Sequence, residues 1–75
     1  MISQIHRMNA GDLVRMKVGW SGIGIIQSVM DEHPRADETT FRTIREDLKR
    51  PHARVFWTDV GLSELVAVSN LTGVE

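Results

Sequence analysis

The stretch GDLVRMKVGWSGIGIIQSVM, residues 11–30, restricts the possible folds of this chain more than any other. In DLVRMKV, apolar and charged residues alternate with a period of two, which is typical of a β-strand with one buried face. The following run, GIGIIQSVM, is rich in isoleucine and favours a strand that crosses the centre of a small barrel. The pattern predicts that Val14, Met16 and Val18 point inward and that Arg15 and Lys17 point outward.

Three glycines interrupt this stretch. Gly19 and Gly22 bracket Trp20, and two glycines so close together favour a tight connection with positive φ. Gly24 lies inside the second strand, where a glycine marks a bulge, a sharp bend or a close backbone approach, and small barrels need such bends to close. A phosphate-binding loop requires its glycines to open a helix, whereas these lead into a strand. We therefore interpret all three glycines as structural.

The chain has 75 residues, which is the size of one domain, residues 1–75. It contains no cysteine, so neither disulfides nor thiolate metal sites supplement its core. The net charge of −1 gives no whole-molecule attraction to nucleic acid or membranes. No segment approaches the ~20 apolar residues of a membrane span, and MISQIHRMN lacks the apolar run of a signal peptide. The sequence therefore predicts a cytoplasmic protein with no membrane partner.

Residues 31–52 depart from the strand pattern and are predicted to be an insertion. Phe41, Ile44 and Leu48 have the spacing of one helical stripe, with Thr39 or Thr40 as its N-cap. The β propensity of TTFRTIR leaves a hairpin as the alternative. Because so short a helix is not stable alone, we expect its apolar stripe to dock on the barrel.

The strand pattern resumes in ARVFWTD, where Ala53, Val55 and Trp57 fall on one face and Arg54 and Phe56 on the other. A turn at residues 59–61 precedes LSELVAVS, which we expect to supply the last strand. Residues 1–10 and residues 70–75 are predicted to be short tails. In the first, Ile2, Ile5 and Met8 are spaced by three, which suits one helical turn or a tail that lies over the barrel.

The order of GDLVRMK, a glycine turn, GIGIIQSV, ARVFWTD and LSELVAVS resembles the Src-homology-3-like small barrels encoded by phages. It is also similar to the KOW motif of ribosomal and transcription proteins. The likeness covers residues 11–30 and 53–69. It implies a mainly β fold, a Src-homology-3-like barrel of about five strands with a partly helical insertion. It also implies a small virion or accessory component, located in the virion or the host cytoplasm.

No combination of residues predicts catalysis or a cofactor. His33 and His52 flank the insertion near several carboxylates, but a metal site needs three or four converging ligands at spacings such as HExxH, which are missing here. There is no cysteine nucleophile and no GxSxG motif. A barrel of this size fills its interior with side chains. We therefore expect a protein that is not an enzyme and has no catalytic, metal or cofactor-binding residue.

The residues best suited to contact a partner are an aromatic side chain and several cations. Trp20, in a glycine turn, is expected to be partly exposed as an interface anchor, or else to cover an open barrel end. The segment 39–54 carries five basic residues against two acidic ones. These cations either form an ordinary solvated face, with Arg42–Glu46 and Glu46–Arg50 pairs, or contact a protein or phosphate. The predicted partner-binding residues are Trp20, Arg42, Arg45, Lys49 and Arg54.

Two functions follow from these residues. The first is a structural or protein-interaction module that docks on a larger assembly through Trp20 and the insertion. The second is a KOW-type nucleic-acid-binding module that uses the basic insertion together with Arg15, Lys17 and Arg54. KOW proteins usually carry a basic residue in the glycine loop, whereas this loop is Gly-Trp-Ser-Gly. The neutral net charge and the loop favour the first function.

Overall fold

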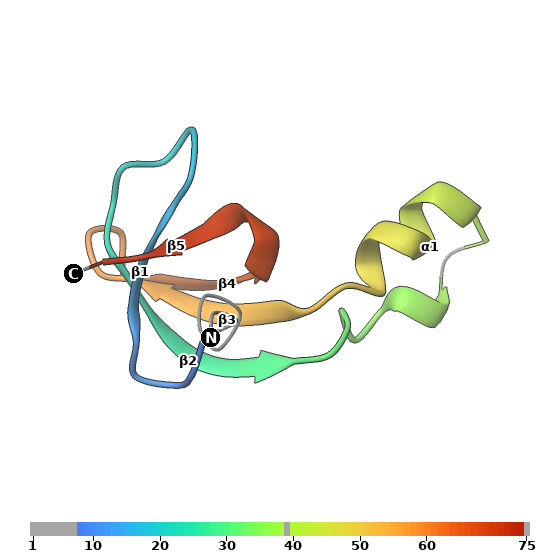
Figure 1. The fold of residues 1–75 in the computed structure, drawn as a ribbon, viewed down its shortest axis with the longest axis horizontal. Helices are drawn as coiled ribbons and strands as arrows, with labels where there is room; N and C mark the ends of the chain where they lie inside the picture. The colour runs from blue at the N-terminus through green and yellow to red at the C-terminus, as the bar shows by residue number, and fades with distance from the viewer. Residues whose placement is uncertain (1–7, 39, 75) are drawn as a thin grey trace, which may run out of the picture.

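The computed structural model describes residues 8–38 and 40–74, so residues 1–7 of the predicted N-terminal tail, with Ile2 and Ile5, lie outside the described residues. The fold is mainly β, as predicted: one antiparallel sheet of five strands in the order β4-β3-β2-β1-β5 (Figure 1). Within the described residues, one α-helix and two short 3-10 helices accompany the sheet. The strands are β1 (Leu13–Met16), β2 (Gly24–Met30), β3 (His52–Trp57), β4 (Leu62–Ala67) and β5 (Leu71–Gly73), and the helices are η2 (Ala36–Glu38), α1 (Arg42–Leu48) and η3 (Val68–Asn70).

The first four strands form a meander, and the last strand returns beside the first. β1 pairs with both β2 and β5, and the 3-10 helix η3 makes the link from β4 to β5. β4 and β5 are the two edges of the sheet, and the described residues show no pairing between them. The predicted strand number is therefore confirmed, while the strand pairing is that of an open sheet.

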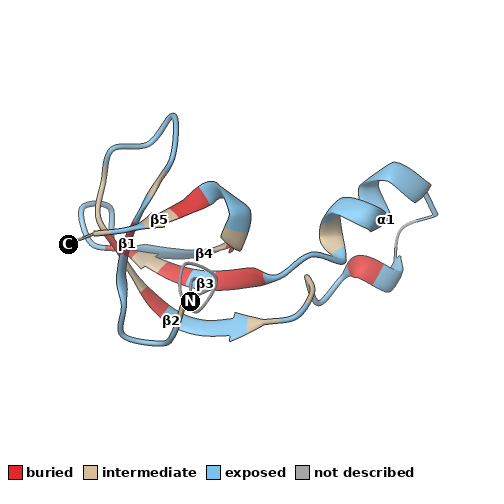
Figure 2. Ribbon diagram, viewed as in Figure 1, coloured by how far each residue is buried: buried red, intermediate tan, exposed pale blue. Residues whose placement is uncertain are grey.

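The hydrophobic core lies on one face of the sheet, since its residues are paired across neighbouring strands, such as Ile26 with Val55 and Ala53 with Val66. Figure 2 colours the buried parts of the strands red. The alternation predicted for ARVFWTD is confirmed: Ala53, Val55 and Trp57 are buried, whereas Arg54 is exposed and Phe56 half-buried. Met8, Met16 and Val68 pack around the edge of the core. The core consists of Val14, Ile26, Ala53, Val55, Trp57, Val66 and Leu71.

The first predicted strand is shorter than its sequence pattern. β1 ends at Met16, and Val18, expected in the core, is 82% exposed. The chain turns away after Lys17, whose N–H donates to the Asn70 carbonyl, and Gly19 adopts a φ of 93°. The alternating sequence pattern therefore extends beyond β1 itself, which ends where its pairing with β5 ends.

The predicted C-terminal tail contributes to the sheet instead. Leu71–Gly73 forms β5, with Gly73 opposite Val14 and Leu71 opposite Met16. Leu71 is only 2% exposed and belongs to the core. The NLTGVE segment is too short and too polar for its pattern to reveal a strand, and the free edge of β1 is what orders it.

Gly24 is required by close packing and not by a bend. Its φ is not positive, and the irregularity of the β2–β3 ladder lies between Ile26 and Ser28. A Cβ atom at Gly24 would overlap Cγ1 of Val55 and would lie 2.9 Å from the Trp57 ring. Of the roles predicted for this glycine, the close approach of β3 is the one observed.

The insertion projects from the sheet as an arm, here defined as residues 31–51 (Figure 1). It contains α1, as the apolar stripe predicted, but the stripe does not dock on the sheet. Phe41 is 67% exposed and Ile44 49% exposed, and α1 packs against η2. The prediction of docking was wrong because η2, which the sequence pattern does not reveal, supplies the helix with a nearer surface.

The arm is held by contacts among its own residues and by its junction with the sheet. We call this junction, which contains His33 and His52, the neck. The N–H of His33 donates to the Leu48 carbonyl at 2.7 Å, and Lys49 pairs with Asp37 at 3.3 Å. At the neck, the imidazole rings of His33 and His52 meet edge-to-face with centroids 5.2 Å apart. Phe41 occupies the N-cap position without a side-chain cap hydrogen bond, so Thr40 lies one residue before the cap, and Thr39, the other predicted cap, lies outside the described residues.

Replacing Phe41, Ile44 and Leu48 together by serine is expected to lower the free energy of unfolding by less than about 2 kcal/mol, because Phe41 and Ile44 are exposed and Leu48 is only half-buried. Hydrogen exchange should show loss of protection in the arm and retained protection in β1–β3. Val66→Ser, in the core, serves as the control that weakens every strand. Global unfolding of the triple variant would contradict the separation of arm and core.

Candidate functional site

The loop between β1 and β2, residues 17–23, presents Trp20 with 43% of its surface exposed, as expected of a tryptophan in a glycine turn. Gly22 lets two polar groups approach the loop backbone closely. A Cβ atom on Gly22 would lie 2.5 Å from the Trp20 indole nitrogen and 2.8 Å from the Asp59 carboxylate. Asp59 belongs to the turn between β3 and β4, so this glycine brings the two loops together.

A concavity of about 220 Å³ lies between these loops. We call it the apolar hollow. Trp57 reaches it from the core, and its indole N–H donates to Glu64 Oε1 at 2.8 Å. Val60 and Leu62 remain 49% and 66% exposed beside it. The apolar hollow is lined by Trp20, Trp57, Val60, Leu62, Ser63 and Glu64.

The edge of the apolar hollow is acidic. Glu64 uses one carboxylate oxygen to accept from Trp57, and Asp59 lies beside Trp20 around Gly22. Among the residues that the structure describes, no ion pair involves Asp59 or Glu64. The hollow therefore combines apolar walls with two carboxylates that have no cationic partner within residues 8–38 and 40–74.

A second concavity, of about 430 Å³, lies where β1 continues into the 17–23 loop, and we call it the cationic hollow. Arg15 and Lys17 point outward here, as the alternation of β1 predicted, and no ion pair within the described ranges involves either side chain. Trp20 lines both concavities. The other residues of the cationic hollow are Met16, Val18, Gly19, Ser21 and Thr72.

The structure separates Trp20 from the other predicted partner-binding residues. Arg42, Arg45 and Lys49 lie on the arm, at the end of the molecule away from the 17–23 loop (Figure 1). Arg54 lies on the exposed face of β3, opposite Leu65 of β4. The five residues thus do not form one site.

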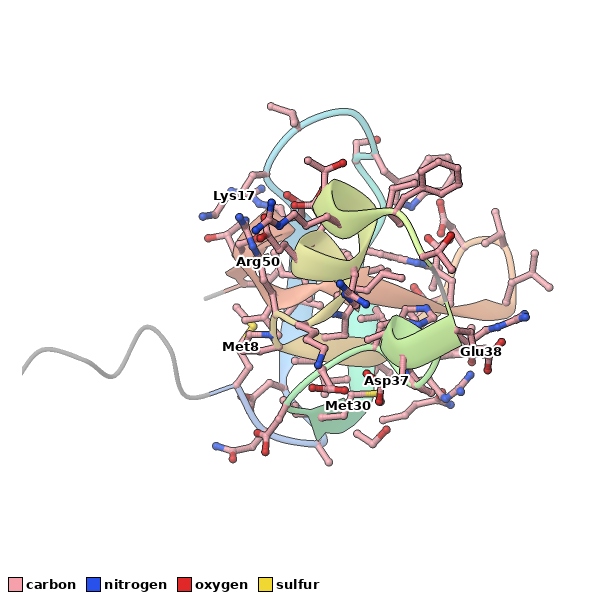
Figure 3. All side chains as sticks on the ribbon, turned by 90° about the vertical axis from the view of Figure 1, so that its right-hand side faces the viewer. Met8, Lys17, Met30, Asp37, Glu38 and Arg50 are labelled. Atoms are coloured by element: carbon pink, nitrogen blue, oxygen red, sulfur yellow. The ribbon has the colours of Figure 1, made fainter. Side chains whose placement is uncertain are left out.

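The cations of the arm are largely paired along its surface. Arg42 lies 3.9 Å from Glu46, as predicted, whereas Arg50 pairs with Asp47 at 3.8 Å and not with Glu46. Figure 3, viewed from the end of the arm, shows Asp37, Glu38 and Arg50 with their charged groups in solvent. Arg45 forms no ion pair in the described part of the chain.

The two histidines of the insertion act as structural groups at the neck. His52 is 6% exposed, with Nδ1 2.7 Å from the Arg50 carbonyl oxygen. His33 Nδ1 accepts from the Arg35 N–H at 3.1 Å. Within the described residues no three His, Asp or Glu side chains lie together as metal ligands would.

Sequence reasoning did not identify the residues that complete the apolar hollow. Its walls come from Trp20 and from residues 57–64, which are far apart in the chain, and only the fold brings them together. One local signal was available: Val60 and Leu62 are large aliphatic residues on either side of a turn glycine, where polar residues are usual.

Comparisons of the chain with protein-family models, with curated proteins and with solved structures find no match. No helix in the part of the chain that the structure describes has both the length and the apolar character needed to cross a membrane.

Proposed function

We propose that this chain is a non-enzymatic protein-interaction module that docks on a larger assembly through Trp20 and the apolar hollow. The observation that carries this proposal is the group of exposed apolar side chains, Trp20, Val60 and Leu62, around one concavity. Tryptophan is enriched among residues that dominate binding energies, and such residues insert into or line small pockets. A volume of about 220 Å³ is below the range of small-molecule sites and suits a single large side chain of a partner.

The fold proposed for the module is a Src-homology-3-like barrel. Its support is the meander of four strands, the 3-10 helix η3 before the last strand, and the return of β5 to β1. The resemblance to phage proteins extends the proposal to a small virion component or accessory factor, present in the virion or the host cytoplasm.

Trp20→Ala is expected to weaken partner binding by at least tenfold while the fold persists, because anchors of this kind contribute about 2 kcal/mol or more. The matched control is Leu13→Ala, a residue of similar exposure (46%) on β1 that lines neither hollow. The immobilised wild-type chain and both variants are offered extracts of the cells that produce it, and the retained proteins are identified by mass spectrometry. Retention that is equal for all three would contradict the proposal.

A second function, nucleic-acid binding, is favoured by one observation: Trp20 also borders the cationic hollow with Arg15 and Lys17. An exposed aromatic ring beside two cations is the arrangement on which single-stranded nucleic acid stacks. The cations of the arm support this function less, because Arg42 and Lys49 are paired with carboxylates.

If nucleic acid is the partner, Arg15→Glu with Lys17→Glu should elute from heparin at lower salt than the wild-type chain, and the salt slope of its binding to single-stranded DNA should fall by about two, one for each lost phosphate contact. Arg42→Glu with Lys49→Glu is the control for charge alone, since it reverses two cations away from Trp20. If the wild-type chain passes through heparin unretained, the nucleic-acid function is excluded and protein docking is left.

A further inference from the structure

The exposed face of α1 combines apolar side chains with a cation. Phe41 and Ile44 are 67% and 49% exposed. Arg45 lies in α1, and its backbone N–H donates to the Phe41 carbonyl at 2.9 Å, which holds the two residues close together. Arg45 has no ion-pair partner among the described residues, unlike its neighbour Arg42. The arm therefore presents an aromatic ring, an aliphatic side chain and a guanidinium group on a projecting tip.

The apolar hollow has the complementary properties. Its walls are the two tryptophans with Val60 and Leu62, and its volume suits one large side chain. Glu64 lines it and Asp59 adjoins it, and both carboxylates lack a cationic partner in the described ranges. An aromatic ring that enters this hollow with an arginine beside it would meet apolar surface and negative charge together.

The arm cannot occupy the hollow of its own chain. In Figure 1, α1 lies at one end of the molecule, and the 17–23 loop and the β3–β4 turn lie at the other. The longest dimension of the chain is 38 Å, and the core sheet stands between the two ends. A contact between them therefore has to be made by two molecules, and it joins unlike surfaces.

We propose that the partner of the apolar hollow is a second copy of this chain, whose arm inserts Phe41 while Arg45 approaches Asp59 and Glu64. This inference rests on the proposed function, since it uses the same hollow. Each molecule in such a contact keeps a free arm or a free hollow, so the association continues head to tail into a ring or a filament.

The test uses two variants with one defective surface each. Phe41→Ser removes the arm contact, and Trp20→Ala removes the hollow contact. Sedimentation is followed from about 10 μM to about 1 mM, because a small interface gives weak association. The wild-type chain should form species larger than a dimer with rising concentration, and each variant alone should stay monomeric. An equal mixture of the two should form dimers and nothing larger, since it contains one intact pair of surfaces.

Charge reversal supplies a second, independent measurement. Arg45→Glu and Asp59→Lys are each expected to raise the dissociation constant at least tenfold, and the double variant should recover most of the loss. Leu13→Ala should associate like the wild-type chain. A wild-type chain that remains monomeric at about 1 mM would overturn self-association, and Trp20-dependent retention of a different protein would then leave the docking function standing. Larger species that persist in both Phe41→Ser and Trp20→Ala would also overturn the proposed contact.

Discussion

Replacing Gly24 by valine is expected to lower the free energy of unfolding by about 3 kcal/mol, the upper end of the usual range for overpacking. The added side chain has no space, because Val55 and Trp57 already fill the position that a Cβ atom would take. Neither neighbour can yield easily, since they are 0% and 3% exposed. A 75-residue domain has a total stability of about 4–11 kcal/mol, so this is a large fraction of it.

The measurement is thermal unfolding, in which a loss of this size should lower the Tm by more than about 12 °C. Gly24→Ala, which adds only the Cβ atom, should already be destabilised. Gly73→Ala is the matched control: it also lies in a strand, but nothing stands within 4 Å of its added Cβ. Equal melting of the two alanine variants would show that close packing is not the reason for Gly24.

Trp57→Ala is expected to cost about 3–5 kcal/mol, as is usual when a buried aromatic residue is removed from a core. Trp57 is 3% exposed, packs between β2 and β4, and donates its indole N–H to Glu64. Trp20→Ala should cost less than about 1 kcal/mol, because this side chain is 43% exposed in a loop. Both tryptophans thus line the apolar hollow, but Trp57 mainly stabilises the fold, whereas Trp20 is available for contact with a partner.

Urea unfolding of both variants distinguishes these roles. Trp57→Phe keeps a buried ring but loses part of the ring volume and the hydrogen bond to Glu64, so its stability should lie between those of Trp57→Ala and the wild-type chain. If Trp20→Ala proves as destabilising as Trp57→Ala, then Trp20 is a core residue and its use in binding experiments would be invalid.

The sequence predicts best those elements whose pattern is local and whose burial is one-sided. In β3 the alternation of Ala53, Val55 and Trp57 with Arg54 and Phe56 allows only one face to be buried, since a shift by one residue would bury Arg54. The exposure of Trp20 was also predictable, because flanking glycines place it in a turn. Helix α1 was predictable from the spacing of Phe41, Ile44 and Leu48.

Other features depend on contacts that no local pattern contains. The spacing of the α1 stripe shows that one side of the helix is apolar, but it does not say what covers that side. β5 forms because β1 offers it an edge, and nothing in NLTGVE itself specifies a strand. The apolar hollow requires Trp20 and Leu62 to meet, and their proximity depends on the whole sheet.

The two ends of the arm leave the sheet side by side, so the number of residues in the arm can change without disturbing the strands. Met30 and His52 are paired partners at the end of the β2–β3 ladder, so the two ends of the arm lie about 5 Å apart, a gap that a two-residue hairpin turn also spans. Doubling the length of a flexible connection costs only about 0.6 kcal/mol in entropy. Insertions, deletions or grafted peptides between residues 30 and 52 are thus compatible with the sheet, whereas a one-residue deletion within β3 would turn its buried side chains to solvent.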